Sequence, residues 1–381
     1  MELVEKPQGH SPHRYEVEIC RGYMGTILTQ RRYFTMKAVG IILVLAALVV
    51  GMAGCAGLPS KNLEIRDWYD LDAVRDNLTG NHRLMNDLDA ISAGYEELAS
   101  PTANGGKGWQ PIGHWDPTKG QGTIFEGTLD GQGYEIRDLF INRPDEYSVG
   151  LFGAVHGSYQ PGSGIVANVG VVNATVTGGS SVGALVGYIT HLLSQPGAVS
   201  NCYVTGSVVG NSAVGGLVGL NIGTVGSCYS IACVTGHDQV GGLVGTTSSG
   251  TVSNSYSGGN VTGYTNVGGL AGSNRGAVSS CYSSAWVTGE QNVGGLVAAN
   301  NGTVNDSFWD IEASGTENSA GGTGKNTTEM KHIATFTETG PEGLDVPWDI
   351  TVVNPGQTNL DYVWNIVDGE TYPFLSWESV T

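Results

Sequence analysis

Apolar residues along this chain fall in short runs of Val, Leu, Ile and Ala, broken every few residues by Gly, Asn and Ser. Such runs are typical of short β-strands joined by tight turns, because β-branched residues favour strands while Gly and Asn favour turns. One stretch, Trp68 to Asn77, instead has apolar residues spaced by three and four, which predicts a helix. The pattern therefore predicts an all-β chain with one short helix near its start.

The apolar runs repeat with a nearly fixed period. The hexapeptide Val-Gly-Gly-Leu-Val-Gly recurs with small variations at spacings of 32, 26, 27 and 26 residues, beginning at Val182, Val214, Val240, Val267 and Val293. A Val-Thr-Gly block and an aromatic block keep the same step. Repeats of this length indicate a solenoid, in which each unit buries its apolar face against its neighbours. We expect each repeat to form one coil of about three short strands.

Side chains two residues apart on a strand share a face, and this rule orients several columns of the repeat. One column should point inward, with Val208, Val234, Val261 and Val287. The small residues two positions earlier should share that face, at Gly206, Ala232, Gly259 and Ala285. The column between them should point outward, with Ser207, Cys233, Asn260 and Trp286. Two further columns are predicted to lie in the core, namely Leu217, Leu243, Leu270 and Leu296, and a stacked ladder of Tyr203, Tyr229, Tyr256, Tyr282 and Phe308.

The ends of the repeat set the predicted domain organisation. About nine coils should occupy residues 81–310. Residues 65–80, which contain the helix, should cover the first coil, and residues 311–381, a polar loop followed by an aromatic-rich segment, should close the last one. Such caps are expected because an exposed strand edge invites aggregation.

A targeting segment precedes the repeat. Residues 36–54 carry Lys37, then the apolar run Gly40 to Val50, then small residues directly before Cys55. This arrangement resembles the signal peptide of prokaryotic lipoproteins, which implies lipidation of Cys55 and a linker over residues 55–64. Because the charged start of the signal lies at Lys37, we interpret residues 1–35 as a mis-called extension. The alternative is an uncleaved anchor helix, and both place the rest of the chain outside the cytoplasm, attached to the cell envelope.

Composition narrows the class of protein. Gly accounts for 60 of 381 residues without a Gly-X-Y period, which excludes collagen. Asp and Glu number 35 against 17 Lys and Arg, giving a formal net charge of −18. This balance disfavours a nucleic-acid partner, which needs a basic surface.

The repeated core Gly216-Leu217-Val218-Gly219 resembles the GLUG motif of exported bacterial and archaeal surface proteins. The resemblance covers roughly residues 65–377 and implies a right-handed parallel β-helix of the pectin-lyase type. It implies no catalytic residues. The motif also occurs in large IgA-specific metallopeptidases, but this sequence has no His-Glu-x-x-His zinc motif.

The sequence presents no catalytic constellation. Its histidines stand singly, without the spacing of metal ligands, so neither a metal nor a cofactor is expected. Asp238 and Glu290 lie two coils apart and are interpreted as solvated turn charges rather than a glycosidase pair. Cys202 and Cys228 occupy one column of adjacent coils, within reach of a disulfide, whereas Cys233 should be free.

A candidate ligand surface surrounds Trp286 in the outward column. An exposed aromatic ring suits stacking against a sugar, and the turn residues nearby could supply polar contacts, namely Tyr264, Thr265, Asn266, Glu290 and Gln291. The alternative is that a loop or the C-terminal segment covers Trp286. We therefore predict a non-catalytic adhesion or glycan-binding module whose partner is an extracellular glycan or another surface protein. The rivals are a polysaccharide lyase or hydrolase, suggested only by analogy of fold, and a purely structural envelope protein.

Overall fold

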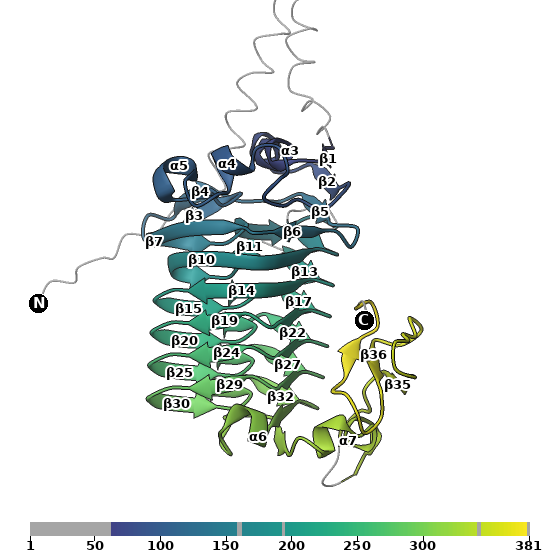
Figure 1. The fold of residues 1–381 in the computed structure, drawn as a ribbon. Helices are drawn as coiled ribbons and strands as arrows, with labels where there is room; N and C mark the ends of the chain where they lie inside the picture. Colours follow the sequence, from purple (N-terminus) through teal and green to yellow (C-terminus); the bar gives the residue numbers. More distant parts are fainter. Residues whose placement is uncertain (1–61, 158–161, 193–194, 341–343, 379–381) are drawn as a thin grey trace, which may run out of the picture. The chain divides into compact units, whose positions relative to one another are not determined.

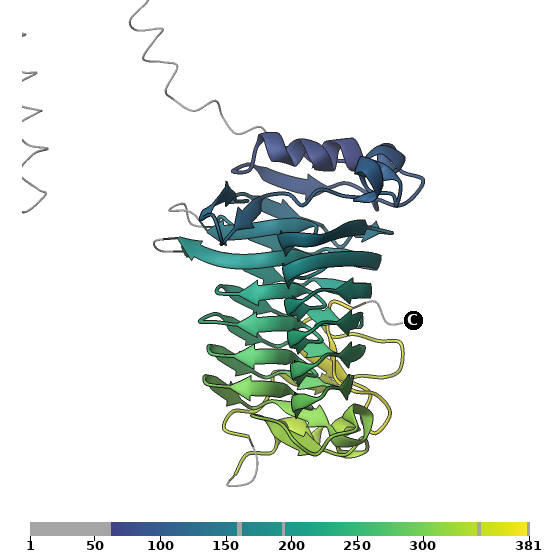
Figure 2. The same ribbon diagram turned by 90° about the vertical axis from the view of Figure 1, so that its left-hand side faces the viewer.

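The computed structural model describes residues 62–157, 162–192, 195–340 and 344–378, and Figures 1 and 2 show coils stacked as parallel ribs. Three long sheets run along the stack, and nearly all their strand pairs are parallel and in register. The fold is thus the predicted parallel β-solenoid. Cys55 and the residues of the predicted signal peptide lie outside the described residues.

The first sheet has nine strands that follow one another in sequence order. Its strands are β1 (Glu64–Ile65), β2 (Asn81–Leu84), β5 (Thr128–Asp130), β9 (Ile165–Ala167), β13 (Ala198–Ser200), β17 (Thr224–Gly226), β22 (Thr251–Ser253), β27 (Ala277–Ser279) and β32 (Thr303–Asn305). Its inward residues in the central coils are Val199, Val225, Val252 and Val278, all buried.

The second sheet has sixteen strands and turns a corner, so it covers two faces of the solenoid. Its strands are β6 (Glu135–Arg137), β7 (Phe140–Val149), β10 (Gly170–Val182), β14 (Tyr203–Val209), β15 (Ser212–Gly215), β18 (Tyr229–Ser230), β19 (Cys233–Thr235), β20 (Asp238–Gly241), β23 (Tyr256–Ser257), β24 (Asn260–Thr262), β25 (Thr265–Gly268), β28 (Tyr282–Ser283), β29 (Trp286–Thr288), β30 (Gln291–Gly294), β33 (Phe308–Asp310) and β34 (Thr323–Lys325).

The third sheet completes the cross-section. Its strands are β8 (Phe152–Gly157), β11 (Val186–Leu192), β12 (Gln195–Pro196), β16 (Val218–Asn221), β21 (Val244–Thr247), β26 (Ala271–Asn274) and β31 (Val297–Asn300). Outside the coils lie the hairpin of β3 (His114–Asp116) and β4 (Gln121–Thr123), and a small sheet of β35 (Ile350–Val352), β36 (Trp364–Ile366) and β37 (Phe374–Leu375).

The helical segments are short and lie toward the ends of the solenoid. Near the first coils are α3 (Trp68–Asp72), the 3-10 helix η2 (Ala73–Asp76), α4 (Tyr95–Leu98) and α5 (Ala103–Gly106); after the last coil come α6 (Ile311–Ser314), the 3-10 helix η3 (Glu329–Lys331) and α7 (Ala334–Thr337). The helix expected over Trp68–Asn77 is thus α3 followed by η2. Its buried residues Trp68, Leu71 and Val74 join the main core.

Two corners of each coil are set by residues in the left-handed region of backbone space. One column has φ between 46° and 57°, at Asn168, Asn201, Ser227, Asn254, Ser280 and Asp306. The other has φ between 51° and 57°, at Ser148, Ser181, Ala213, Gln239, Asn266 and Asn292. Asn tolerates this conformation better than most residues because its side chain can bond locally. The polar residues that interrupt the apolar runs therefore fix where the chain turns.

The solenoid interior confirms most of the column assignments. The four predicted Leu residues and the four Val residues of the inward column are buried. Gly206 and Gly259 lie so close to the preceding coil that a Cβ would fall 2.2 and 2.0 Å from a backbone oxygen. In the outward column Cys233, Asn260 and Trp286 are exposed. Cys202 and Cys228 are buried free thiols rather than a disulfide, and each lies 3.1 Å from a backbone carbonyl oxygen.

The aromatic ladder was placed wrongly by the sequence pattern. The four tyrosine rings stack as predicted, whereas the Phe308 ring packs against Phe336 and Trp348. The ladder lies outside the solenoid interior: Tyr229, Tyr256, Tyr282 and Phe308 belong to a second apolar cluster with the C-terminal segment, and Tyr203 contacts Trp377 of that segment. The pattern misled because each Tyr follows directly on a left-handed corner and a buried residue, so the side-chain alternation places it on the outer face. There the C-terminal segment, which runs back alongside the coils, covers it (Figure 1).

Candidate functional site

The tyrosine ladder, formed by Tyr203, Tyr229, Tyr256 and Tyr282, is a continuous stack of rings along the second sheet. Its consecutive ring centroids are 5.0, 4.9 and 4.9 Å apart, and their planes differ by 15°, 10° and 3°. This step matches the spacing of neighbouring strands, since the tyrosines pair directly across β14, β18, β23 and β28. The repeat thereby builds an aromatic surface that no single coil could provide.

The C-terminal segment packs on the lower part of the ladder. Trp364 and Tyr372 lie 5.9 and 6.0 Å from the Tyr282 ring, and the Tyr282 hydroxyl donates a 2.7 Å hydrogen bond to the carbonyl of Pro373. The segment then reaches the upper part, where Trp377 stacks on Tyr229 at 5.7 Å and lies 6.2 Å from Tyr203. Trp377 is therefore the last aromatic contact between this segment and the ladder.

A groove of about 580 Å³ opens where Trp377 meets the ladder. We call it the tyrosine groove; its lining includes Glu135, Tyr203, Tyr229, Trp377 and Glu378, with Asp130, Gln132, Asn168 and Asn201 along its rim. Its volume is that of a small-molecule pocket, and it combines aromatic side chains with a few polar groups, as ligand sites commonly do. A second hollow of about 530 Å³ lies farther along, beside Tyr256, Tyr282 and Pro373.

Two carboxyl groups in the tyrosine groove hold tyrosines of different coils. Glu135, on β6, accepts a hydrogen bond from the Tyr203 hydroxyl and is paired with Arg137. Glu378 accepts a 3.0 Å hydrogen bond from the Tyr256 hydroxyl and a 2.6 Å bond from the backbone N–H of Leu375. Burial raises the pKa of the Glu378 carboxyl to about 7, despite these two donors. A fraction of Glu378 therefore keeps its proton near neutral pH.

Tyr229 stands between these two anchored tyrosines. Among the described residues its hydroxyl has no hydrogen-bond partner, although Tyr203 and Tyr256 on either side both have one. Burial, together with the nearby Glu378 carboxyl, raises the pKa of Tyr229, so the hydroxyl stays protonated. A protonated phenol can donate and accept a hydrogen bond, which makes it a ready contact for a hydroxylated ligand.

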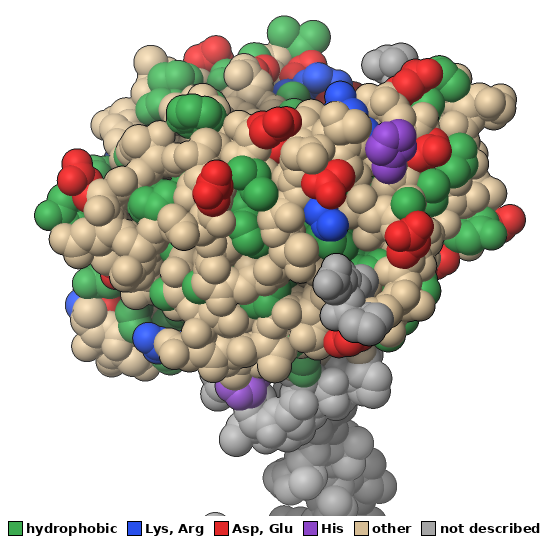
Figure 3. Space-filling view, turned by 90° about the horizontal axis from the view of Figure 1, so that it is seen from below, with side chains coloured by type: hydrophobic (Ala, Val, Ile, Leu, Met, Phe, Trp, Pro, Cys, Tyr) green, Lys and Arg blue, Asp and Glu red, His purple; other side chains and the backbone are tan. Residues whose placement is uncertain are grey.

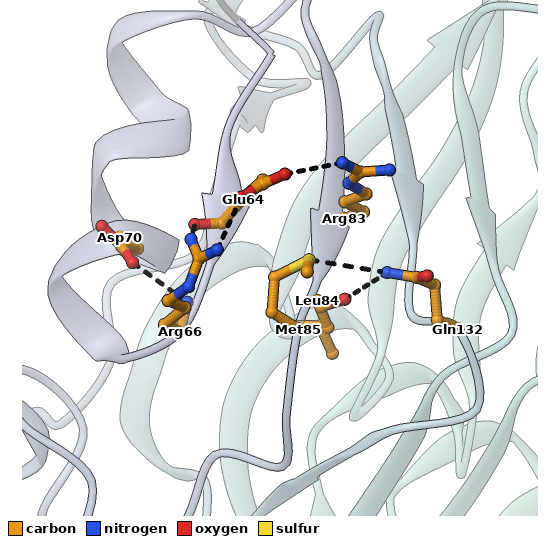
Figure 4. Close-up of polar contacts among 7 residues, drawn as sticks. All are labelled: Glu64, Arg66, Asp70, Arg83, Leu84, Met85 and Gln132. Carbon is orange, nitrogen blue, oxygen red and sulfur yellow. Dashed lines mark hydrogen bonds and ion pairs between the residues drawn. The ribbon is translucent and has the colours of Figure 1, made fainter.

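The N-terminal coils fix the rim of the groove. Gln132 extends its side-chain amide back to the carbonyl of Leu84 and to the sulfur of Met85 (Figure 4). Nearby, Glu64 on β1 forms ion pairs of 2.6 Å with both Arg66 and Arg83, and Arg83 lies on β2 (Figure 4). The Gln132 bonds join its loop to the end of β2 and thus hold one edge of the groove, while the Glu64 ion pairs tie β1 to β2.

The ligand surface predicted from the sequence, around Trp286, is not part of the tyrosine groove. Trp286 is 54% exposed, so it is not covered, although one edge of its ring lies against Gly315 after α6. The turn residues meet at one corner of the coils: the backbone N–H groups of Glu290 and Gln291 both donate to the carbonyl of Tyr264, Thr265 pairs with Gln291, and the Asn266 amide bonds to Asp238. Tyr264 stacks on His237 at 5.2 Å.

The groove residues were not indicated by the sequence pattern. The pattern assigns the tyrosines to the interior, and it assigns the tail that carries Trp377 and Glu378 only to closing the last coil. One signal was available: a column of five aromatic residues and an aromatic-rich tail are complementary surfaces, and pairing them would have placed both on the outside.

Two other kinds of site can be assessed for the part of the chain that the structure describes. There, no three His, Cys, Asp or Glu side chains are grouped so as to hold a metal ion. In the same residues no helix has both the length and the apolar character needed to cross a membrane. Acidic and hydrophobic side chains on the face seen from below are scattered rather than gathered in one patch (Figure 3).

With this geometry in view, the chain can be compared with known proteins. Residues 178–209 match the family model of the GLUG motif. The matched range contains the end of β10 and then β11, β12, β13 and β14, so the GLUG match spans about one coil of the solenoid. The fold also resembles the crystal structure of a proposed immunoglobulin A1 protease from Bacteroides ovatus, with a TM-score of 0.56 and 21% identity over 85% of this chain and 94% of that one. That likeness supports the solenoid fold alone.

Two proteins are similar in sequence to part of this chain. Halomucin of Haloquadratum walsbyi is 36% identical over 166 residues, which is 43% of this chain but 2% of halomucin. A proposed Gly-rich membrane protein of Evansella cellulosilytica is 35% identical over 140 residues, which is 35% of this chain and 14% of that protein. The matches therefore span only a small part of either relative.

Proposed function

We propose that this protein is a non-catalytic cell-surface module that binds an extracellular saccharide in the tyrosine groove. The observation that carries the proposal is the junction of Trp377 with Tyr203 and Tyr229, which encloses aromatic rings and hydrogen-bonding groups in one cavity. A sugar ring presents an apolar face and several hydroxyls, so the same cavity can satisfy both. Aromatic side chains also provide contact area at low cost in conformational entropy.

The surface location is supported by the names of the relatives, halomucin and a Gly-rich membrane protein.

The signal-like segment that ends at Cys55 supports export, and we propose that lipidation of Cys55 attaches the protein to the cell envelope. Replacing Cys55 with Ser should release the protein from membranes of a lipid-modifying host. Incorporation of labelled palmitate into the Cys55→Ser variant at the wild-type level would contradict this attachment.

The groove is tested by a matched pair of tryptophan variants. The wild-type protein is screened on a glycan array, and the best saccharide is titrated by calorimetry into Trp377→Ala and Trp286→Ala. Because Trp377 forms a wall of the groove and Trp286 lies on a different face, we expect binding to fall at least tenfold in Trp377→Ala only. A loss in Trp286→Ala alone would instead favour the surface predicted from sequence.

Trp377→Ala could also displace the C-terminal segment, so a gentler variant accompanies it. Tyr229→Phe removes only the hydroxyl that has no partner among the described residues and keeps the stacked ring. We expect weaker binding at unchanged thermal stability. Unchanged affinity in both Tyr229→Phe and a correctly folded Trp377→Ala would rule out the groove.

One observation favours a carbohydrate-active enzyme as the second candidate. Glu135 and Glu378 bond tyrosines two coils apart, whose rings are about 10 Å apart along the ladder, just beyond the roughly 6.5–9.5 Å between the two carboxyls of an inverting glycosidase. We prefer binding because Glu135 is already held by both Arg137 and Tyr203, which hinders its use as a base. Release of new reducing ends from a bound oligosaccharide, lost in Glu378→Gln, would favour the enzyme.

A further inference from the structure

The charged side chains that line the tyrosine groove are all carboxylates, namely Asp130, Glu135 and Glu378. These three carboxylates differ in their ion-pair and hydrogen-bond partners. Glu135 is paired with Arg137, and Asp130 lies at the exposed rim. Within the described residues, Glu378 is bonded only by neutral donors, the Tyr256 hydroxyl and the backbone N–H of Leu375.

This leaves Glu378 as a partly buried acid without a cation beside it among the described residues. Taking a carboxylate out of water is costly unless an opposite charge accompanies it. A ligand that brings a positive charge to this position would supply the missing counter-ion. The adjacent aromatic rings would help, because a cation near the face of Trp or Tyr is attracted by the π-electrons.

We propose that the saccharide bound in the tyrosine groove is an amino sugar, whose ammonium group pairs with Glu378 while its ring lies against Trp377. This inference rests on the proposed saccharide-binding function and names the class of sugar. The Tyr229 hydroxyl, which has no hydrogen-bond partner among the described residues and lies near both Glu135 and Glu378, is placed to bond a ring hydroxyl. The site is the aromatic cavity, and the carboxyl group selects among the sugars that fit it.

The same arrangement disfavours other saccharides. Sulfated sugars and uronic acids carry negative charge, and they would meet three carboxylates on a protein whose formal net charge is −18. Neutral sugars can stack and form hydrogen bonds, but they leave Glu378 without a counter-ion. An N-acetylated amino sugar is such a neutral ligand, and it differs from the amino sugar only at the nitrogen.

The contact between Glu378 and an ammonium group is tested by comparing an amino sugar with its N-acetylated form. Calorimetry with the full chain compares fully deacetylated and fully N-acetylated glucosamine hexamers at pH 6, where the free amine is charged and where its pairing with Glu378 releases the proton that this carboxyl holds in the free protein. We expect the deacetylated hexamer to bind about tenfold more tightly, the effect of one charge-assisted contact. In Glu378→Gln the preference should vanish through loss of affinity for the deacetylated hexamer, while binding of the acetylated hexamer stays within about twofold.

Two controls separate this contact from general attraction between opposite charges. Glu317→Gln removes an exposed carboxylate outside the groove and should leave both affinities unchanged. A lysine hexamer carries similar charge without sugar rings and should bind at least tenfold more weakly. Equal affinity of the wild type for both sugars, or equal binding of the lysine hexamer, would overturn the ammonium contact but not the saccharide function. If neither sugar nor any array glycan binds, the proposed function itself fails.

Discussion

Glu378 lies where the C-terminal segment meets the tyrosine ladder, and its carboxyl accepts hydrogen bonds from Tyr256 and Leu375. In an unfolded chain the pKa of this carboxyl returns to its ordinary value of 4.5, whereas in the folded protein burial raises it to about 7. Between these two values the folded state holds a proton that the unfolded state has lost. Folding stability should therefore decrease as pH rises from about 4.5 to about 7.

The contribution of Glu378 to the free energy of unfolding is measured from urea unfolding at several pH values. In the wild type this free energy should fall by about 2 kcal/mol between pH 4.5 and pH 7, less than the full pKa shift implies because the side chain is partly exposed. Glu378→Gln has no titrating carboxyl and should show a shallower dependence on pH, whereas the exposed control Glu317→Gln should follow the wild type. An unchanged slope in Glu378→Gln would show that this carboxyl is not perturbed by folding.

At the scale of single elements, side-chain alternation predicted the strands more reliably than the corners. The inward Val column and the outward position of Cys233 follow from alternation within one strand, where one register places every residue. The tyrosines begin β14, β18, β23 and β28, each separated from a left-handed corner by one buried residue. Local pattern does not specify the direction in which a chain leaves such a corner, so the ladder was assigned to the interior when it faces the tail.

The position of the C-terminal segment also could not be predicted from the local sequence pattern. Its aromatic residues, including Trp348, Trp364 and Tyr372, predicted that it would close the last coil, and in the structure they form a core with the end of the ladder. Its course could not be predicted, because the segment lies outside the repeat and contacts residues 122 to 174 positions earlier in the chain, from Tyr256 with Glu378 to Tyr203 with Trp377. The tyrosine groove depends on this long-range packing, which explains why its residues did not stand out in the sequence.

At the scale of the whole molecule, the repeat and the tail have separate roles. The coils provide a rigid stack that aligns identical residues about 5 Å apart, and the tail converts one side of that stack into an enclosed groove. The solenoid was predictable because a 26-residue period recurs over many coils. The groove occurs once, where the tail crosses, so the repeat gives no indication of it.

The central claim, that the tyrosine groove is the ligand site, is tested most directly by amide hydrogen exchange with and without a saturating saccharide. Ligand binding slows exchange where it suppresses local opening. We predict slower exchange in residues 130–135, 168–170, 201–203 and 375–378, which border the groove, and no change in residues 262–266 and 286–291. Protection confined to residues 262–266 and 286–291 would contradict the account and place the ligand at Trp286.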